Sequence, residues 1–348
     1  MREIAAKAKP IASDGRRGPS TGPLRLVAVV VTYNRLAQLK ITLSRLLDHT
    51  RSELAGVLVI DNASTDGTEG WLTTLVAELA GQGEERLTVH RCETNLGGAG
   101  GFETGMKLAV AQYDPDWLVV MDDDARPSLG ALTAFHRQPR DGAEAWAAAV
   151  YHPDGRICDM NRPSINPFWH RTVLWRTLLG RGRDGFHLGA ADYASSQPCA
   201  IDGTSFVGFF VSRAGIALAG YPDGRLFLYG DDVLYTLGLR DAGGRILFDP
   251  SLKFEHDFTT ISDTDKRFRP LWKSYYHYRN LLMVYRLCSG YFFVLVGPAA
   301  AIKWLLKVRY HGGERRAYLG YVLRALRDGL FGRLNLPHTR VLGWGRRQ

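Results

Sequence analysis

The sequence predicts an α/β protein built on a mostly parallel, doubly wound sheet. Continuous apolar runs rich in β-branched residues alternate with helical patterns between residues 26 and 121. The apolar runs are uninterrupted, as in strands that are buried on both faces. Polar residues follow directly after each run, so the loops at the carboxyl ends of the strands should meet at one edge of the sheet. Open α/β sheets bind their ligands at that edge.

The predicted elements follow one another in a regular order. The first apolar run, residues 26–32, reads as a buried strand, and leucines at helical spacing predict a helix from Leu36 to Leu47. Further strands at 57–60, 87–90 and 117–121 alternate with helices at 71–79 and 106–111, and a glycine-rich turn at 95–101 precedes the last of these helices. Strand–helix alternation of this kind predicts parallel pairing.

The alternation weakens beyond residue 145. Residues 161–200 look irregular, and we expect them to form a flap that closes over a substrate. The remaining predictions are a strand at 206–211, a helix from 230 to 241, short strands at 245–248 and 252–254, and helices from Phe268 onward.

Three consecutive carboxylates end the strand at 117–121. A sheet interior cannot hold ionised Asp122, Asp123 and Asp124, so the strand must end there. If the strand geometry continues, Asp122 and Asp124 project to the same side and can hold one hard divalent cation through oxygen. An isolated acidic triplet is more simply a solvated turn, here before Pro127. The other polar residues of the chain favour the cation site.

Five of these other residues lie at strand ends or near helix starts. Asp61, at a strand end, suits hydrogen bonds from a base or a ribose, whereas Asp66 more simply caps the next helix. A lone histidine such as His256 is usually structural, but an imidazole also completes a manganese site. Capping explains only one of Asp231 and Asp232 at the start of the 230–241 helix, so Asp232 is a candidate general base.

The glycine-rich turn does not define a familiar nucleotide motif. A dinucleotide fingerprint belongs after the first strand, which here ends in Thr-Tyr-Asn-Arg without glycine, and no P-loop sequence occurs. The glycines either let the backbone approach a nucleotide or sugar closely or allow tight packing of a helix on the sheet. The sequence leaves both explanations open.

Positive charge is concentrated near the C-terminus of the 348-residue chain. The net charge is +9, and residues 300–348 hold eleven lysines and arginines but only Glu314 and Asp328 as acids. Residues 268–310 are aromatic and basic, which indicates either a helix at an anionic membrane surface or an amphipathic helix packed on the catalytic domain. The longest uncharged run, 287–302, is short for a membrane-spanning helix. No motif supports nucleic-acid binding.

The rest of the composition suggests a cytoplasmic protein on the inner face of the plasma membrane. Four cysteines (Cys92, Cys158, Cys199 and Cys288) are scattered without zinc or disulfide spacing, so we expect reduced thiols. Residues 1–23 lack the apolar core of a signal peptide and read as a disordered leader. We expect a catalytic domain at 24–262 and a basic, aromatic helical region at 263–348.

Several motifs in this order resemble those of the inverting glycosyltransferases of family 2, which have the GT-A fold: a mixed, mostly parallel sheet with flanking helices. The resemblance covers roughly residues 25–260. Within the family, the chain is most similar to the bacterial branch that contains galactofuranosyltransferases and rhamnosyltransferases. It rests on Val31-Thr-Tyr-Asn-Arg35, Val59-Ile-Asp-Asn-Ala-Ser-Thr-Asp-Gly-Thr68, Asn95-Leu-Gly-Gly-Ala-Gly-Gly101, Met121-Asp-Asp-Asp124, Gly230-Asp-Asp-Val233 and Phe254-Glu-His256.

The resemblance implies a reaction and a set of residue roles. The donor would be a UDP- or dTDP-sugar, the acceptor a glycan or polyprenyl-linked chain of the cell surface, and Asp232, or less simply Asp231, the base. Asp122, Asp124 and His256 would hold Mn²⁺ or Mg²⁺. The substrate-binding residues would be Thr32, Tyr33, Asn34, Arg35, Asp61, Asn95, Gly97, Gly98 and Asp123.

Two departures from the family pattern concern the base. Leu234 stands where an acidic residue often follows it, and Gly238 stands where an arginine is frequent, with Arg240 nearby. Two other classes stay open. A sugar-nucleotide nucleotidyltransferase would need a glycine-rich, basic loop after the first strand, which residues 32–35 lack. An inactive sugar-nucleotide-binding protein would not need the intact acids.

Overall fold

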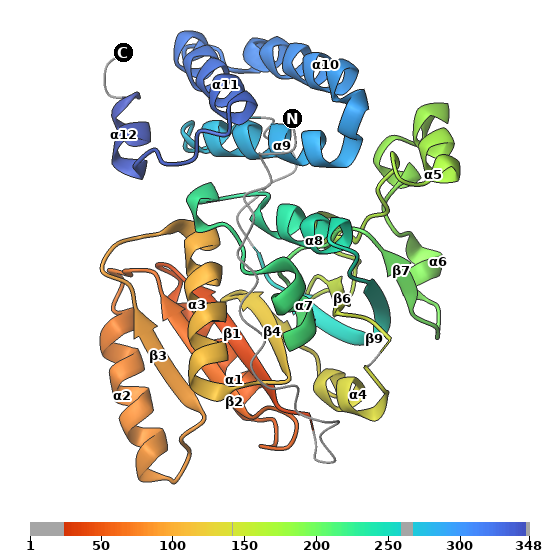
Figure 1. The fold of residues 1–348 in the computed structure, drawn as a ribbon. Coiled ribbons are helices and arrows are strands. Elements are labelled where there is room, and N and C mark those ends of the chain that lie inside the picture. The colour runs from red at the N-terminus through yellow and green to blue at the C-terminus, as the bar shows by residue number, and fades with distance from the viewer. Residues whose placement is uncertain (1–23, 141, 259–266, 346–348) are drawn as a thin grey trace.

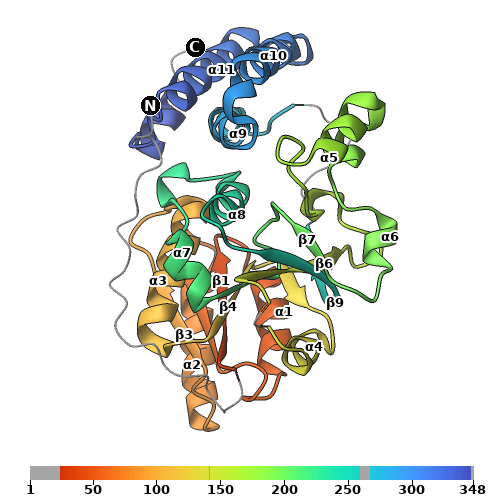
Figure 2. The same cartoon turned by 45° about the vertical axis from the view of Figure 1, so that its right-hand side comes forward.

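A computed structural model of the chain describes residues 24–140, 142–258 and 267–345. The predicted leader at 1–23 and the predicted domain boundary at 262 lie outside these residues. An α/β part carries a group of helices formed by the C-terminal residues, and α8 lies beneath α9 at the junction (Figures 1 and 2).

One nine-stranded sheet organises the α/β part. Its order is β3-β2-β1-β4-β8-β6-β9-β5, and β7 pairs with β9. Strands β3, β2, β1 and β4 are parallel, as predicted, whereas β8, β5 and β7 run antiparallel to their neighbours. The strands are β1 (Leu26–Thr32), β2 (Gly56–Asp61), β3 (Leu87–Arg91), β4 (Trp117–Asp122), β5 (Ala125–Pro127), β6 (Ala145–Tyr151), β7 (Cys199–Ile201), β8 (Phe209–Ser212) and β9 (Ile246–His256).

Helices cover both faces of the sheet. Alternate residues of β1 point to opposite sides: Ala28 and Val30 pack with α1, α2 and α4, whereas Val27 and Val29 pack with α3, α7 and α8. These helices are α1 (Leu36–Leu47), α2 (Thr68–Gly81), α3 (Gly97–Tyr113), α4 (Ala131–Arg137), α7 (Arg213–Ala219) and α8 (Asp231–Asp241).

The glycine run differs from its prediction. It forms the first turns of α3 rather than a separate turn before the helix. A Cβ atom on Gly101 or Gly105 would lie 2.5 Å from Val31 or Val29, so these two glycines bring α3 close to the sheet. A Cβ atom on Gly98 would meet nothing within 4 Å. Tight packing of the helix on the sheet is therefore confirmed for Gly101, whereas close approach of the backbone to a ligand at Gly98 stays a prediction.

The second half of the sheet also departs from the prediction. The two short strands expected at 245–248 and 252–254 are one strand, β9, whose register against β6 shifts between Ala148 and Ala149. The strand expected at 206–211 is β8, which begins at Phe209. The segment 161–200 contains two short helices, α5 (Arg171–Arg176) and α6 (Ala190–Tyr193).

Four helices form the C-terminal part. They are α9 (Lys273–Ser289), α10 (Phe293–Leu306), α11 (Arg315–Leu330) and α12 (His338–Gly343), and their shared core includes Tyr278, Trp304 and Tyr318. The helical stretch Lys273–Tyr310 is long and apolar enough to cross a membrane, judged by length and composition alone. Its backbone leaves the helical conformation at Gly290 (φ +51°), and α10 packs back against α9 (Figure 1).

Candidate active site

The predicted polar loops meet at the carboxyl edge of the parallel strands. Thr32 of β1 lies opposite Asp61 of β2, and Val31 lies opposite Asp122 of β4. Parallel pairing in register brings the three strand ends together. The side chains that follow them therefore share one surface of the molecule.

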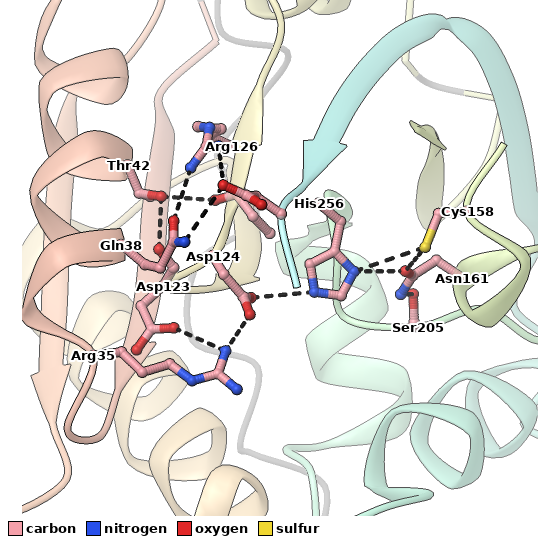
Figure 3. A network of polar contacts seen from close by, with 12 residues as sticks. Arg35, Gln38, Thr42, Asp123, Asp124, Arg126, Cys158, Asn161, Ser205 and His256 are labelled. Atoms are coloured by element: carbon pink, nitrogen blue, oxygen red, sulfur yellow. Dashed lines mark hydrogen bonds and ion pairs between the residues drawn. The ribbon is translucent and has the colours of Figure 1, made fainter. Parts of the chain in front are cut away.

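Arg35 and Thr32 contact two of the three consecutive aspartates, and Figure 3 shows Arg35 between Asp123 and Asp124. The Thr32 hydroxyl donates a hydrogen bond to Asp123 Oδ2 at 2.7 Å, and the Arg35 guanidinium pairs with Asp124 and lies 3.7 Å from Asp123. Burial raises the pKa of Asp123 to about 7. Asp123 is thus a buried acid that Thr32 holds in place.

Asp122 interacts electrostatically with Asp231, the first acid of α8. Burial raises the pKa of Asp122 well above the ordinary value, and the Asp124, Asp123 and Asp231 carboxylates raise it further. Burial and the Asp232 carboxylate in turn raise the pKa of Asp231. Acids that are more than one hundred residues apart therefore interact, and their repulsion favours binding of a cation.

His256 connects this acidic cluster to a buried polar network. Its Nδ1 lies 2.8 Å from Asn161 Oδ1, and an amide oxygen can only accept, so Nδ1 carries the proton. Asn161 is itself oriented by donating to Ser205 Oγ at 2.8 Å. His256 Nε2 faces Asp124 Oδ1 at 3.2 Å (Figure 3). This nitrogen is consequently free either to donate as an imidazolium or to ligate a metal.

The donor atoms fit a metal site that a substrate completes. Within the described ranges, no group of three or more His, Cys, Asp or Glu side chains is arranged to hold a metal ion. Asp124 and His256 are in contact, however, with Asp122 beside them, and oxygen and imidazole donors suit Mn²⁺. Ions of this kind commonly take one or two protein ligands plus substrate phosphates.

Several residues that were predicted to bind the sugar nucleotide make contacts between loops. Asn34, at φ +54°, accepts a hydrogen bond from the Thr65 N–H at 2.7 Å and so joins the first two loops. Asp61 is fully buried and accepts hydrogen bonds from Arg91 and from the Ser64 N–H. Beside them lies a cavity of about 370 Å³, lined by Asp61, Glu69, Leu72, Thr73, Val76, Val89 and Arg91. Asp61 thus forms part of a hollow, with Arg91 as its cationic wall.

The start of α3 is held by asparagine side chains. Asn95 Oδ1 accepts a hydrogen bond from the Gly97 N–H at 2.8 Å, and Asn62 donates to Gly97 O at 2.8 Å. Gly97 has φ +73°, and a Cβ atom there would lie 2.0 Å from Phe227 O, so only glycine fits. Tyr33 is 44% exposed, so its ring, like the open side of Gly98, is free to contact a ligand.

Asp66 and Arg240 have structural contacts. Asp66 accepts hydrogen bonds from the Leu36 N–H at the start of α1 and from the Thr68 N–H and hydroxyl at the start of α2. It thus joins two helix starts, whereas the N-cap residue of α2 is Gly67 and not Asp66. Arg240 pairs with Asp202, which also accepts hydrogen bonds from His170 and from the Asn166 N–H. Asp202 therefore anchors the base of the 161–200 segment, and closure of that segment over a substrate stays a prediction.

Asn280 and Arg279 of α9 hold the loop that precedes the α8 acids. The Asn280 amide nitrogen donates to the carbonyls of Leu226, Leu228 and Tyr229 at 3.1, 2.9 and 2.7 Å. Arg279 also donates to Leu226 O at 2.7 Å, and both side chains are fully buried. The loop needs this support because the non-glycine residue Tyr229 has φ +67°.

Sequence analysis missed four polar residues of this region: Asn62, Arg91, Asn161 and Lys273. Asn62 follows β2 and Arg91 is the last residue of β3, so their position at the carboxyl edge could have identified them. Lys273 lies near Arg35, and burial and this neighbouring positive charge lower its pKa. No local signal marks Asn161 or Lys273, because each reaches the site only through the tertiary fold.

The sheet with its acidic carboxyl edge defines a protein of the GT-A class. Solved structures share this fold. One is GalNAc-T7 with UDP, GalNAc and Mn²⁺; the match has a TM-score of 0.53 and 13% identity, and it covers 77% of this chain and 48% of that one. Another is a Pyrobaculum calidifontis mannosyltransferase with GDP-Man and Mn²⁺; the match has a TM-score of 0.51 and 16% identity, and it covers 90% of this chain and 89% of that one. At these identities the similarity concerns the fold alone.

The chain belongs to glycosyltransferase family 2, whose family model matches residues 27–179. It is 36% identical over 182 residues to an undecaprenyl-phosphate mannosyltransferase of Micrococcus luteus, covering 51% of this chain and 70% of that protein. It is 29% identical over 207 residues to the galactofuranosyltransferase GlfT1 of Mycolicibacterium smegmatis, covering 59% and 62%. The chain thus spans about three fifths of the length of that galactofuranosyltransferase.

Replacing Asn280 with alanine should loosen the loop before α8. The carbonyls of Leu228 and Tyr229 would lose the Asn280 donor, at a cost of about 1–3 kcal/mol for each group left unsatisfied, whereas Leu226 O would keep its hydrogen bond from Arg279. We expect amide hydrogen exchange of residues 227–231 to accelerate at least tenfold. Asn335→Ala, which changes an exposed asparagine, is the control. Equal exchange in the two variants would show that Asn280 does not support the loop.

Proposed function

We propose that this protein is an inverting glycosyltransferase. It moves a sugar from a nucleotide-diphosphate donor to a hydroxyl of a glycan or polyprenyl-linked acceptor in cell-surface polysaccharide synthesis. The proposal is supported above all by the meeting of Asp124 and His256 with Asp122 and Asp231 at one edge of the sheet. This arrangement provides a place for a cation and a diphosphate next to an acid able to accept a proton.

Different residues of the chain bind the donor and accept the proton. The hollow beside Asp61 and Arg91 receives the nucleoside, while the open side of Gly98 lets the backbone approach the donor. Asp232 takes the proton of the acceptor hydroxyl as its oxygen attacks the anomeric carbon and the bond to the diphosphate breaks. Asp231 is the alternative base. One displacement of this kind inverts the configuration.

Asp122, Asp124 and His256 would hold a divalent cation, Mn²⁺ or Mg²⁺. When bound, it supplies Lewis-acid neutralisation of the charge that develops on the leaving diphosphate. Lys273 and Arg35 add positive charge near the same edge. The Lys273 ammonium and the Arg35 guanidinium are suited to orient the diphosphate oxygens.

Galactofuranose and rhamnose are the first donor sugars to test. The galactofuranosyltransferase relatives support UDP-galactofuranose, and the undecaprenyl-phosphate mannosyltransferase relative adds a mannose nucleotide to the screen. Release of nucleoside diphosphate with glycosyl transfer would identify a glycosyltransferase. Pyrophosphate release would instead identify a nucleotidyltransferase, and binding without turnover an inactive sugar-nucleotide-binding protein.

We also propose that α10 rests on the inner surface of the plasma membrane. Val294, Leu295 and Ile302 are 74, 69 and 59% exposed, and Tyr291 is 99% exposed. Lysines and arginines flank these residues, as in helices at anionic lipid surfaces. The acceptor would then be reached from the membrane side.

Substitution of Asp124 should abolish metal-stimulated transfer. Asp124→Ala removes the oxygen donor that faces His256, so activity should no longer respond to Mn²⁺ or Mg²⁺ after treatment with a chelator. Asp154→Ala, at an exposed aspartate, is the matched control and should keep the response. A metal response in Asp124→Ala equal to that of the control would refute the proposed metal site.

The role of Asp232 predicts a defined pH dependence. Burial raises its pKa to about 6, and a base works only when ionised, so kcat should fall by about tenfold between pH 8 and pH 5. Asp232→Asn should lower kcat by about 10²–10⁴ while donor binding is kept. The corresponding Asp231→Asn variant decides between the two acids. Full turnover in Asp232→Asn would place the base elsewhere.

The membrane contact predicts lower affinity for vesicles when α10 becomes polar. Val294, Leu295 and Ile302 changed together to glutamine should reduce co-sedimentation with phosphatidylglycerol vesicles at least tenfold, because the inserted apolar area is lost. A control variant with Ile41, Leu129 and Leu218 changed to glutamine alters three exposed apolar residues of the α/β part. If both variants sediment equally, α10 is not the contact surface.

A further inference from the structure

The C-terminal helices line a second cavity, which is open to solvent and distinct from the acidic edge. It has a volume of about 1260 Å³ and lies between α11, α12 and the segment that joins them. Four arginines line it: Arg324, Arg327, Arg333 and Arg340. Among the described residues of its wall, Asp328 is the one acid. We call this the basic cavity.

Three of the four arginines carry positive charge that the described residues do not neutralise. Arg327 pairs with Asp328, whose carboxylate also accepts a hydrogen bond from the Tyr275 hydroxyl. In the part of the chain that the structure describes, Arg324, Arg333 and Arg340 have no carboxylate partner within 4 Å. Several guanidinium groups around one hollow match the fork geometry of phosphate oxygens.

Aromatic rings fix two of these arginines in place. The Arg324 guanidinium lies 4.8 Å from the centre of the Trp344 ring, and the Arg333 guanidinium lies 5.6 Å from that of Phe331. Such contacts leave the edges of the guanidinium, where its N–H groups point, available to a ligand. Two cations of the cavity are therefore pre-oriented.

Two exposed apolar residues are neighbours of residues that line the basic cavity: Leu323 precedes Arg324, and the Phe331 ring contacts Arg333. Leu323 and Phe331 are 56 and 69% exposed, and they precede and follow Arg327 by one helical turn. Exposed apolar side chains that flank several unpaired arginines suit a ligand with a phosphate head and a hydrocarbon chain. A free phosphate would not use these apolar residues.

The basic cavity also adjoins the α/β part. Leu334 in its wall packs in one cluster with Ala99 of α3 and Leu226. The His338 ring, at the start of α12, stacks on Phe227 at 4.2 Å, and Phe227 O accepts a hydrogen bond from the Ala99 N–H. A ligand in the cavity would thus lie next to the helix start that carries Gly97 and Gly98.

We propose that the basic cavity binds a diphosphate, with an isoprenoid chain on Leu323 and Phe331. The volume exceeds the roughly 300–1,000 Å³ of a typical small-molecule site, so it has room for a sugar beside the diphosphate. That this ligand is the lipid-linked acceptor rests on the proposed function. Diphosphate binding itself does not.

The test uses the full-length protein in a chelator, which removes metal-dependent diphosphate binding at the acidic edge. Pyrophosphate and farnesyl diphosphate are titrated in a calorimeter against the protein and an Arg333→Gln/Arg340→Gln variant. We expect the variant to bind both probes at least tenfold more weakly. Arg315→Gln/Arg316→Gln, with the same loss of charge at exposed positions of α11 outside the cavity, should stay within about twofold of the unmodified protein.

The two probes separate the two sources of the phosphate. For a lipid head group, farnesyl diphosphate should bind at least tenfold more tightly than pyrophosphate, and Phe331→Ser should remove that difference. Equal binding of both probes would refute the isoprenoid part and leave a site for free diphosphate. Equal affinities in the two double-arginine variants would refute the cavity altogether.

Asp124→Ala separates this proposal from the catalytic one. Its farnesyl diphosphate binding should match that of the unmodified protein, because Asp124 lies at the acidic edge and not in the basic cavity. If no donor sugar is transferred by the unmodified protein but the cavity binds its probe, the catalytic proposal fails and the diphosphate site stands.

Discussion

The structure depends on an electrostatic constraint: four carboxylates gather where the central strands end. Asp122, Asp123, Asp124 and Asp231 influence one another's ionisation through largely buried surroundings. Two like charges 4 Å apart repel by about 4 kcal/mol at the effective dielectric constant near a protein surface. Arg35 and His256 offset part of this repulsion at Asp124, and they lower its pKa although burial opposes ionisation. A cation would relieve the remaining repulsion, as the proposed metal site requires.

The parallel half of the sheet and its acidic edge could be predicted because their signals are local. A continuous apolar run such as 26–32 can only be a buried strand, and carboxylates must lie where such a run ends. The antiparallel half carries weaker signals. Strands β5 and β7 have three residues each, and β6 is rich in alanine, which favours no strand.

Parts of the site depend on contacts that no local pattern encodes. His256 is oriented by Asn161, which is 95 residues away in a segment without clear periodicity. Lys273 read from the sequence as one more cation of a basic region, yet the fold brings it near Arg35. The glycines of α3 differ in role because their surroundings differ: Gly101 contacts the sheet, whereas Gly98 is open. Sequence could predict which residues matter more readily than what each one touches.

Of the two roles that the sequence left open for the C-terminal helices, packing on the α/β part is observed, and the membrane contact stays a proposal. The inner surface of α9 packs on the α/β part, while α10 exposes apolar side chains. Asn280 makes the first of these roles specific, because its three hydrogen bonds fix the backbone before Asp231. One consequence concerns chimeric enzymes. A chimera that joins the α/β part of one relative to the C-terminal helices of another before α9 would separate the loop before α8 from its own Arg279 and Asn280. Exchange of donor specificity between relatives should therefore succeed only when the crossover lies beyond α9.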